Sequence, residues 1–104
     1  MITEECLIKI VNQLHEINKR AAREQITSIE RSCERIKAIL SDEGLVVHDP
    51  AGEKYDSSRT DCEANIISGN ISKDLFITEV IKPIIYSNKN GRRQIVQQGL
   101  VVVE

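Results

Sequence analysis

The residues best suited to chemistry are the cysteines and histidines, but their spacing does not form a site. Cys6, Cys33 and Cys62 are separated by wide gaps and include no Cys-x-x-Cys pair, which the usual zinc and redox motifs require. A cysteine nucleophile needs a histidine beside it, and no pattern places His15 or His48 next to a cysteine. We interpret the cysteines as small apolar side chains in a reducing compartment.

The carboxylates and glycines also lack a catalytic pattern. Asp56 with Asp61 or Glu63 is a candidate acid–base pair, but a segment rich in turn-forming residues, typical of a solvated loop, lies among them. The glycines are scattered as turn residues, and the sequence contains no phosphate-binding loop, Gly-x-Ser-x-Gly or His-Glu-x-x-His motif. We therefore expect a protein that is not an enzyme and that has no cofactor, no metal site and no small-molecule substrate.

Two groups of basic residues are candidates for contacts with a partner. Lys19, Arg20 and Arg23 lie in a helical pattern without interleaved aromatic residues or a DNA-binding motif. Arg92 and Arg93 directly follow a strong turn signal. Adjacent guanidinium groups at a projecting turn are usually only solvated, but they suit docking into an acidic groove of a protein.

Composition limits the classes of partner. The chain has 104 residues, 40% of them apolar and only 3% aromatic, which indicates a small globular protein with an aliphatic core. The net charge of −2 argues against nucleic acid or an anionic membrane as the partner. No apolar run reaches the roughly 18 residues of a membrane span, and the N-terminus lacks the pattern of a signal peptide. We expect a cytoplasmic protein.

The segment from residue 4 to residue 42 contains no Gly or Pro and predicts one long helix, capped by Thr3 and ended by Gly44. Its apolar residues recur in nine steps over 33 residues, an eleven-residue repeat that favours a nearly straight helix pair. Asn18 is the polar member of this stripe. The other members, which we expect at a dimer interface, are Leu7, Val11, Leu14, Ala22, Ile26, Ile29, Cys33, Ile36 and Leu40.

A helix of this length would span about 58 Å, more than the rest of the chain can cover. We therefore expect an obligate homodimer formed through a helix in residues 1–43. The alternative is a helix that folds back near Asn18 to Arg23, although no Gly or Pro marks a turn there.

Residues 44–104 predict a small all-β domain, so the fold class is α+β. The expected β segments are 45–47, 62–67, 75–85, 94–96 and 100–103. Turns are expected at 49–52, 68–70 and 88–91. Pro83 lies inside the longest segment, which places that part at a sheet edge or a bulge.

Several motifs follow one another in this β part. The clearest are the segment from Gly44 to Asp56, Cys62-Glu63-Ala64, the segment from Glu79 to Pro83, Asn90-Gly91-Arg92 and the terminal Val101-Val102-Val103. Together with the preceding helix, this order resembles the GrpE family, the nucleotide exchange factors of DnaK-type chaperones. The resemblance covers roughly residues 26–104.

The resemblance implies a parallel homodimer in which each chain carries a β wing. One wing contacts both lobes of the chaperone's ATPase domain and opens its nucleotide cleft, so that ADP leaves. The partner contacts would fall on Arg92, Tyr55, Ile81 and Val103, with a small helix residue at Ser28. The sequence departs from the family at Ser57, at Cys62, where the family has histidine, and at Gln97.

A different class of function remains open on the residues alone. A small dimeric coiled-coil adaptor or regulator would bind another protein or DNA through the basic segment Lys19–Arg23. Removing these charges separates the two hypotheses, because it should leave nucleotide exchange nearly unchanged and abolish the adaptor function.

Overall fold

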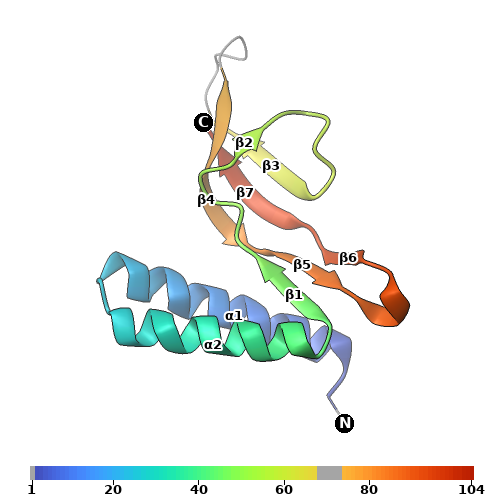
Figure 1. Ribbon diagram of the computed structural model, residues 1–104. Helices are drawn as coiled ribbons and strands as arrows, with labels where there is room; N and C mark the ends of the chain where they lie inside the picture. Colours follow the sequence, from blue (N-terminus) through green and yellow to red (C-terminus); the bar gives the residue numbers. More distant parts are fainter. Residues whose placement is uncertain (1, 68–73) are drawn as a thin grey trace.

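The fold is α+β, with two helices beneath a β unit, in the computed structural model, which describes residues 2–67 and 74–104 (Figure 1). Helices α1 (Glu4–Arg23) and α2 (Thr27–Asp42) run antiparallel and pack on each other. Helix α2 also packs on the first strand of the β unit. Neither helix is long and apolar enough to cross a membrane.

The prediction of one long helix over residues 4–42 was wrong, because the chain turns back directly after Arg23. Gln25 adopts a left-handed conformation with φ of 59°. The backbone N–H of Ile26 donates to Ala21 O (2.8 Å), and the N–H of Gln25 donates to Ala22 O (3.2 Å). These two bonds form a Schellman cap, which usually carries Gly at the left-handed position. The expected fold-back alternative was closer, and the missing Gly explains why the sequence did not favour it.

The outer ends of the helical hairpin were predicted correctly. Thr3 Oγ1 accepts a hydrogen bond from the backbone N–H of Cys6 (3.1 Å), and Glu4 and Glu5 lie in the first turn, where the helix dipole favours acids. Gly44 follows α2 with φ of 88°, a conformation that favours glycine.

The β unit, called the wing below, contains two sheets. The first has the antiparallel order β1 (Leu45–His48), β5 (Ile84–Ser87) and β6 (Gln94–Gln97). The second has the order β2 (Lys54–Tyr55), β4 (Leu75–Lys82), β7 (Gly99–Val103) and β3 (Cys62–Ile66), in which β3 and β7 are parallel. A short 3-10 turn, η1 (Lys89–Gly91), joins β5 to β6.

The turn signals place most of these strands. Pro83 separates β4 from β5, so the segment expected as one strand passes from one sheet to the other at this residue. The turn expected at 49–52 is held by a hydrogen bond from the N–H of Glu53 to Pro50 O (3.1 Å). The turn expected at 68–70 lies outside the described residues.

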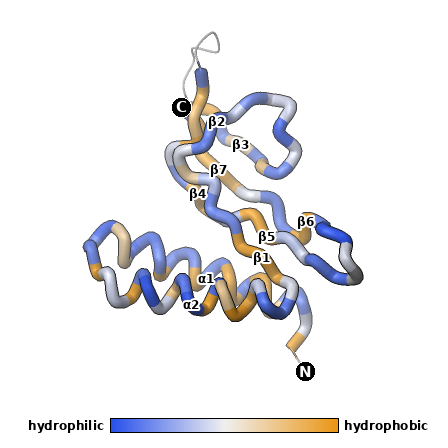
Figure 2. Tube along the Cα trace, viewed as in Figure 1, coloured by the Kyte–Doolittle hydropathy of each residue, from blue (hydrophilic) through white to orange (hydrophobic). Residues whose placement is uncertain are grey.

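Two aliphatic clusters form the core. One lies between the strands of the wing and consists of Cys62, Ile77, Val80, Ile84, Val101 and Val103. The other joins α1 to the first sheet through Val11, Leu45 and Ile85. Along the chain, apolar residues are interspersed with polar ones (Figure 2). Apolar residues come together where the helices meet the wing.

The residues expected in one dimer stripe are divided by the helical hairpin. Val11, Leu14 and Cys33 are buried within the chain, whereas Ile29 and Ile36 remain exposed. Ala22 is also exposed. A single stripe along a straight rod, as we expected from the repeat, is therefore wrong for this chain.

Candidate functional site

The β5–β6 hairpin presents the two adjacent arginines in different ways. The Arg93 guanidinium lies 4.1 Å from the centre of the Tyr86 ring, a cation–π contact that holds it on its own chain. Arg92 is exposed, and its backbone N–H donates to Lys89 O (3.0 Å). None of the ion pairs found within residues 2–67 and 74–104 involves Arg92.

The other contacts implied by the family resemblance do not gather into one patch. Ile81 is 40% exposed on β4. Tyr55 is half-buried against the wing core. Ser28 is exposed in the first turn of α2, at the opposite end of that helix from β1. The expectation of a contact through the Val103 side chain was wrong, because Val103 is fully buried.

A half-buried guanidinium, that of Arg59, organises the loop between β2 and β3. Arg59 donates from Nε to Asp61 Oδ1 (2.6 Å), from Nη2 to Glu53 Oε1 (2.6 Å) and from Nη1 to Lys54 O (3.0 Å). The second oxygen of Glu53 lies 2.6 Å from His48 Nε2. Asp61 is therefore bound to Arg59 and is not available as a catalytic carboxylate.

The charges of this cluster shift its titration. Burial is the largest single effect on Glu53 and Asp61 and alone would raise the pKa of each. It is outweighed by the sum of the hydrogen bonds and charge of Arg59 with a hydrogen bond from His48 to Glu53 and one from Cys62 to Asp61, so both pKa values lie below their ordinary range. Burial, reinforced by the Asp61 charge, raises the pKa of the Cys62 thiol to about 11. Cys62 is therefore protonated at neutral pH, and it contributes to the core rather than to nucleophilic chemistry.

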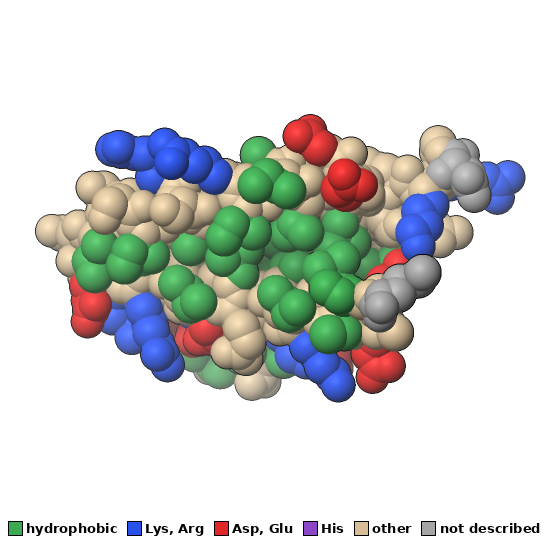
Figure 3. Space-filling model, turned by 90° about the horizontal axis from the view of Figure 1, so that it is seen from below, with side chains coloured by type: hydrophobic (Ala, Val, Ile, Leu, Met, Phe, Trp, Pro, Cys, Tyr) green, Lys and Arg blue, Asp and Glu red, His purple; other side chains and the backbone are tan. Residues whose placement is uncertain are grey.

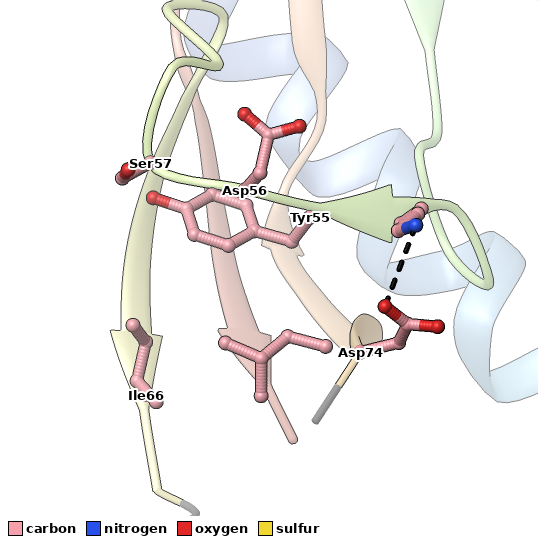
Figure 4. A pocket seen from close by; sticks show the side chains of 7 residues that line it. Tyr55, Asp56, Ser57, Ile66 and Asp74 are labelled. Atoms are coloured by element: carbon pink, nitrogen blue, oxygen red, sulfur yellow. Dashed lines mark ion pairs between the residues drawn. The ribbon is translucent and has the colours of Figure 1, made fainter. Parts of the chain in front are cut away.

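A hollow of about 330 Å³ lies between β2, β3 and the start of β4 (Figure 4). Tyr55, Ile66 and Leu75 supply its apolar lining. At its rim, Lys54 pairs with Asp74 (3.5 Å), and Asp56 accepts a hydrogen bond from the N–H of Ser58 (2.9 Å).

Lys54, Asp56 and Asp74 of this hollow are thus engaged with other groups of the chain. Glu63, the other carboxylate considered for an acid–base pair, is exposed on β3. No group of three His, Cys, Asp or Glu side chains within the described ranges is placed to hold a metal ion.

The helical hairpin carries an apolar groove of about 230 Å³ on its outward face. Ile10 and Ile17 are each 51% exposed there, and Ile36 is 43% exposed. Figure 3 shows apolar side chains along the middle of this face, with charged side chains at its borders. The groove is lined by Leu7, Ile10, Val11, Gln13, Leu14, Ile17, Ile36 and Leu40. Five of these residues belong to the expected stripe: Leu7, Val11, Leu14, Ile36 and Leu40.

The basic segment of α1 does not form one free patch. Lys19 Nζ lies 3.8 Å from Glu16 and 3.5 Å from Glu79 of β4, so this lysine connects the helix to the wing. Arg20 and Arg23 are exposed in the last turn.

The polar contacts between α1 and the wing were not found from the sequence. They involve Asn12, His15 and Lys19, which share one helix face at spacings of three and four residues. This spacing was visible in the sequence, but nothing there showed which strands the side chains would meet.

Two exposed surfaces differ in character: the Arg92 end of the β5–β6 hairpin and the apolar groove of the helical hairpin. The first offers a charge and the second an apolar face. No protein-family model, curated protein or solved structure matches this chain.

Proposed function

We propose that this protein is a non-enzymatic nucleotide exchange factor, similar to the GrpE family, that binds the ATPase domain of a DnaK-type chaperone and promotes ADP release. The observation that carries the proposal is the exposed Arg92 on the β5–β6 hairpin, at the position where the resemblance implies a partner contact. The order of the motifs from Gly44 to Val103 supports it.

The mechanism is differential binding. The wing would bind the open, nucleotide-free ATPase domain more tightly than the closed, ADP-bound form, and by reciprocity nucleotide would weaken its binding. Each tenfold gain in ADP release requires about 1.4 kcal/mol of preference for the open form. Arg92 would donate charge-assisted hydrogen bonds to a carboxylate of the partner, and the exposed Ile81 side chain would add an apolar contact.

A wing that separates the two lobes of an ATPase domain must be rigid enough not to deform when it binds. The stack of Arg93 on Tyr86 braces the hairpin that carries Arg92. The β2–β3 loop is braced by the three hydrogen-bonded partners of Arg59. These contacts would direct binding energy into opening the partner instead of deforming the wing.

The proposal includes a homodimer formed through the helical hairpin rather than through a single rod. The groove is almost entirely apolar and continues into the core, since Val11 and Leu7 belong to both. A second copy supplies a matching apolar face by symmetry. The groove faces away from the wing (Figure 3), so such a dimer would leave both wings uncovered.

The direct test is stopped-flow release of a fluorescent ADP analogue from a DnaK-type ATPase domain, with and without this protein. We expect the wild type to accelerate release and Arg92→Ala to weaken binding at least about tenfold by calorimetry, as expected for loss of a charge-assisted contact. The dimer should remain intact, because Arg92 lies on the wing.

The matched control is the double variant Arg20→Ala and Arg23→Ala, which removes exposed charges from α1 and spares Lys19. We expect it to accelerate ADP release like the wild type. A wild type that leaves ADP release unchanged would contradict the proposed function. Unchanged binding by Arg92→Ala would remove Arg92 from its role. A double variant that no longer accelerates ADP release would contradict the expectation that exchange does not depend on these charges of α1.

A further inference from the structure

Helix α1 meets the wing through a row of three polar side chains. Asn12 and Gln97 exchange two amide hydrogen bonds of 2.9 and 2.8 Å. One helical turn further along, His15 reaches the backbone of β4. At the end of the row, Lys19 pairs with Glu79 (3.5 Å). This row, which we call the polar seam, connects α1 to both sheets of the wing. Asn12 contacts β6 of the first sheet, and His15 and Lys19 contact β4 of the second.

His15 is the most enclosed member of the polar seam. Its side chain is only 2% exposed, and its Nε2 lies 2.8 Å from Val80 O. Because a carbonyl oxygen can only accept, Nε2 must carry the proton of this hydrogen bond. Nδ1 is buried and has no hydrogen-bond partner among the described residues. The site therefore fits the neutral imidazole with its proton on Nε2.

A second proton on His15 would not fit this site. It would create a buried charge and a buried N–H at Nδ1 without an acceptor, both of which are costly. The charged groups that line the cleft beside His15 are Lys19 of α1, Glu79 of β4 and Asp49 of the β1–β2 turn.

These neighbours are already engaged. Lys19 lies between Glu79 and Glu16, which is also on α1, and Asp49 accepts a hydrogen bond from the N–H of Ala51 (3.0 Å). Within the described part of the chain, none of these carboxylates forms a hydrogen bond with His15 Nδ1.

We propose that His15 is a pH-sensitive contact between the helical hairpin and the wing. We call the packing of α1 against β4 at this point the joint. Neutral His15 holds β4 against α1, and protonated His15 leaves its buried site for water. Because only the open joint can accommodate the second proton, acid favours the open joint by linkage. The apolar cluster of Val11, Leu45 and Ile85 remains, so the wing loosens at β4 while it stays attached at β1. This inference does not depend on the proposed chaperone partner.

The test measures the distance between the helical hairpin and the wing as a function of pH. Spin labels are placed at Arg23→Cys and Asn65→Cys, two exposed positions, in a Cys6→Ser background that removes the exposed natural thiol. Labelled chains are diluted with unlabelled protein, so that distances within one chain dominate. Pulsed electron resonance then gives the distance distribution at pH 8 and at pH 5.5.

Three variants isolate the His15 imidazole. His15→Gln keeps an N–H that can donate to Val80 O but cannot take up a proton. His48→Gln removes the other histidine, which is exposed. Glu79→Gln removes the titratable partner of Lys19. We expect the long-distance population to grow at least about tenfold between pH 8 and pH 5.5 in the wild type, His48→Gln and Glu79→Gln.

In His15→Gln the distribution should stay narrow at both pH values. The same acid response in His15→Gln as in the wild type would overturn the proposal. So would a wild-type distribution that does not change while nitrogen NMR of the His15 ring shows that it has become protonated. This second measurement uses the unmodified His15, and it therefore decides the question even where His15→Gln does not fold.

Discussion

At the scale of single residues, Arg59 is the side chain on which the β2–β3 loop depends most. Its guanidinium donates hydrogen bonds to the carboxylates of Glu53 and Asp61 and to the backbone carbonyl of Lys54. We predict that Arg59→Gln lowers the free energy of unfolding by about 2 kcal/mol at pH 7, because hydrogen bonds to charged groups are lost in a half-buried site. Urea denaturation measures this change. The control, Arg35→Gln on an exposed face of α2, should change stability by less than about 0.5 kcal/mol.

The same cluster predicts a pH dependence. The pKa values of Glu53 and Asp61 are lowered from ordinary values of 4.5 and 3.8. A lowered carboxyl pKa contributes stability above the ordinary value, and that stability is lost as the pH falls through the folded-state pKa. The difference between wild type and Arg59→Gln should therefore shrink as the pH is lowered from 5 to 2. An equal difference at both ends of that range would contradict this role for Arg59.

Residue-level predictions from the sequence succeeded where local chemistry decided the outcome. The arginine pair after the turn was identified, but only the structure separates Arg92 from the stacked Arg93. Val103 was assigned to a surface and is fully buried. Successive residues of a strand face opposite sides, so the choice between Val102 and Val103 depends on where β7 sits in its sheet. That position is set by its pairing with β4 and β3, which the sequence does not display.

At the scale of elements, strands bounded by turn residues were predictable and their pairing was not. Pro83 and Gly44 marked real boundaries. The parallel pairing of β3 with β7 joins segments far apart in the sequence, and no local pattern encodes it. Gly99 was interpreted as a turn residue, but it lies in β7, where an added Cβ would stand 2.9 Å from Ile84 Cγ1. Tertiary packing explains this glycine.

The boundary between α1 and α2 was missed because Gln25, and not Gly, occupies the turn between them. Gln25 takes the left-handed position with φ of 59°, which is more favourable for Gly. We predict that Gln25→Gly raises the free energy of unfolding by about 0.5–1 kcal/mol, because the strain at this position is relieved. In a continuous helix the same substitution would lower stability by about 1 kcal/mol. The sign of the change in urea denaturation therefore distinguishes a hairpin from a rod.

The matched control is Arg31→Gly, which places the glycine at an exposed position inside α2. There we expect a loss of about 1 kcal/mol, as usual for glycine in a helix interior. A loss of stability in Gln25→Gly similar to that in Arg31→Gly would argue for a continuous helix in solution.

At the scale of the whole molecule, the two candidate surfaces lie on different parts of the fold. The wing carries Arg92, and the groove lies on the side of the helical hairpin that faces away from the wing (Figures 1 and 3). Binding at one surface therefore does not obstruct binding at the other. The helical part is a hairpin and therefore shorter than the predicted rod, but it still exposes an apolar face. We expect a second copy of the chain to cover that face, as we did for the rod.

This geometry predicts that the dimer depends on isoleucines that the single chain leaves exposed. Ile17 and Ile36 line the groove and are 51% and 43% exposed. Each would contribute about 1 kcal/mol by becoming buried in the dimer, and a carboxylate in its place would be desolvated there. We expect the double variant Ile17→Glu and Ile36→Glu to weaken dimerisation at least about 100-fold in sedimentation equilibrium and to keep the helix content of the wild type.

The matched control is Ile95→Glu, which introduces the same charge at a 41% exposed isoleucine of the wing and should leave the dimer intact. If the groove is the interface, the double variant should also lose less of the proposed nucleotide exchange than of its dimerisation, since the proposed partner contact, Arg92, lies on the wing and is unchanged. A wild-type chain that sediments as a folded monomer at micromolar concentration would refute the dimer. In that case the apolar groove would require a different occupant, while the test of Arg92 on the wing would stand independently.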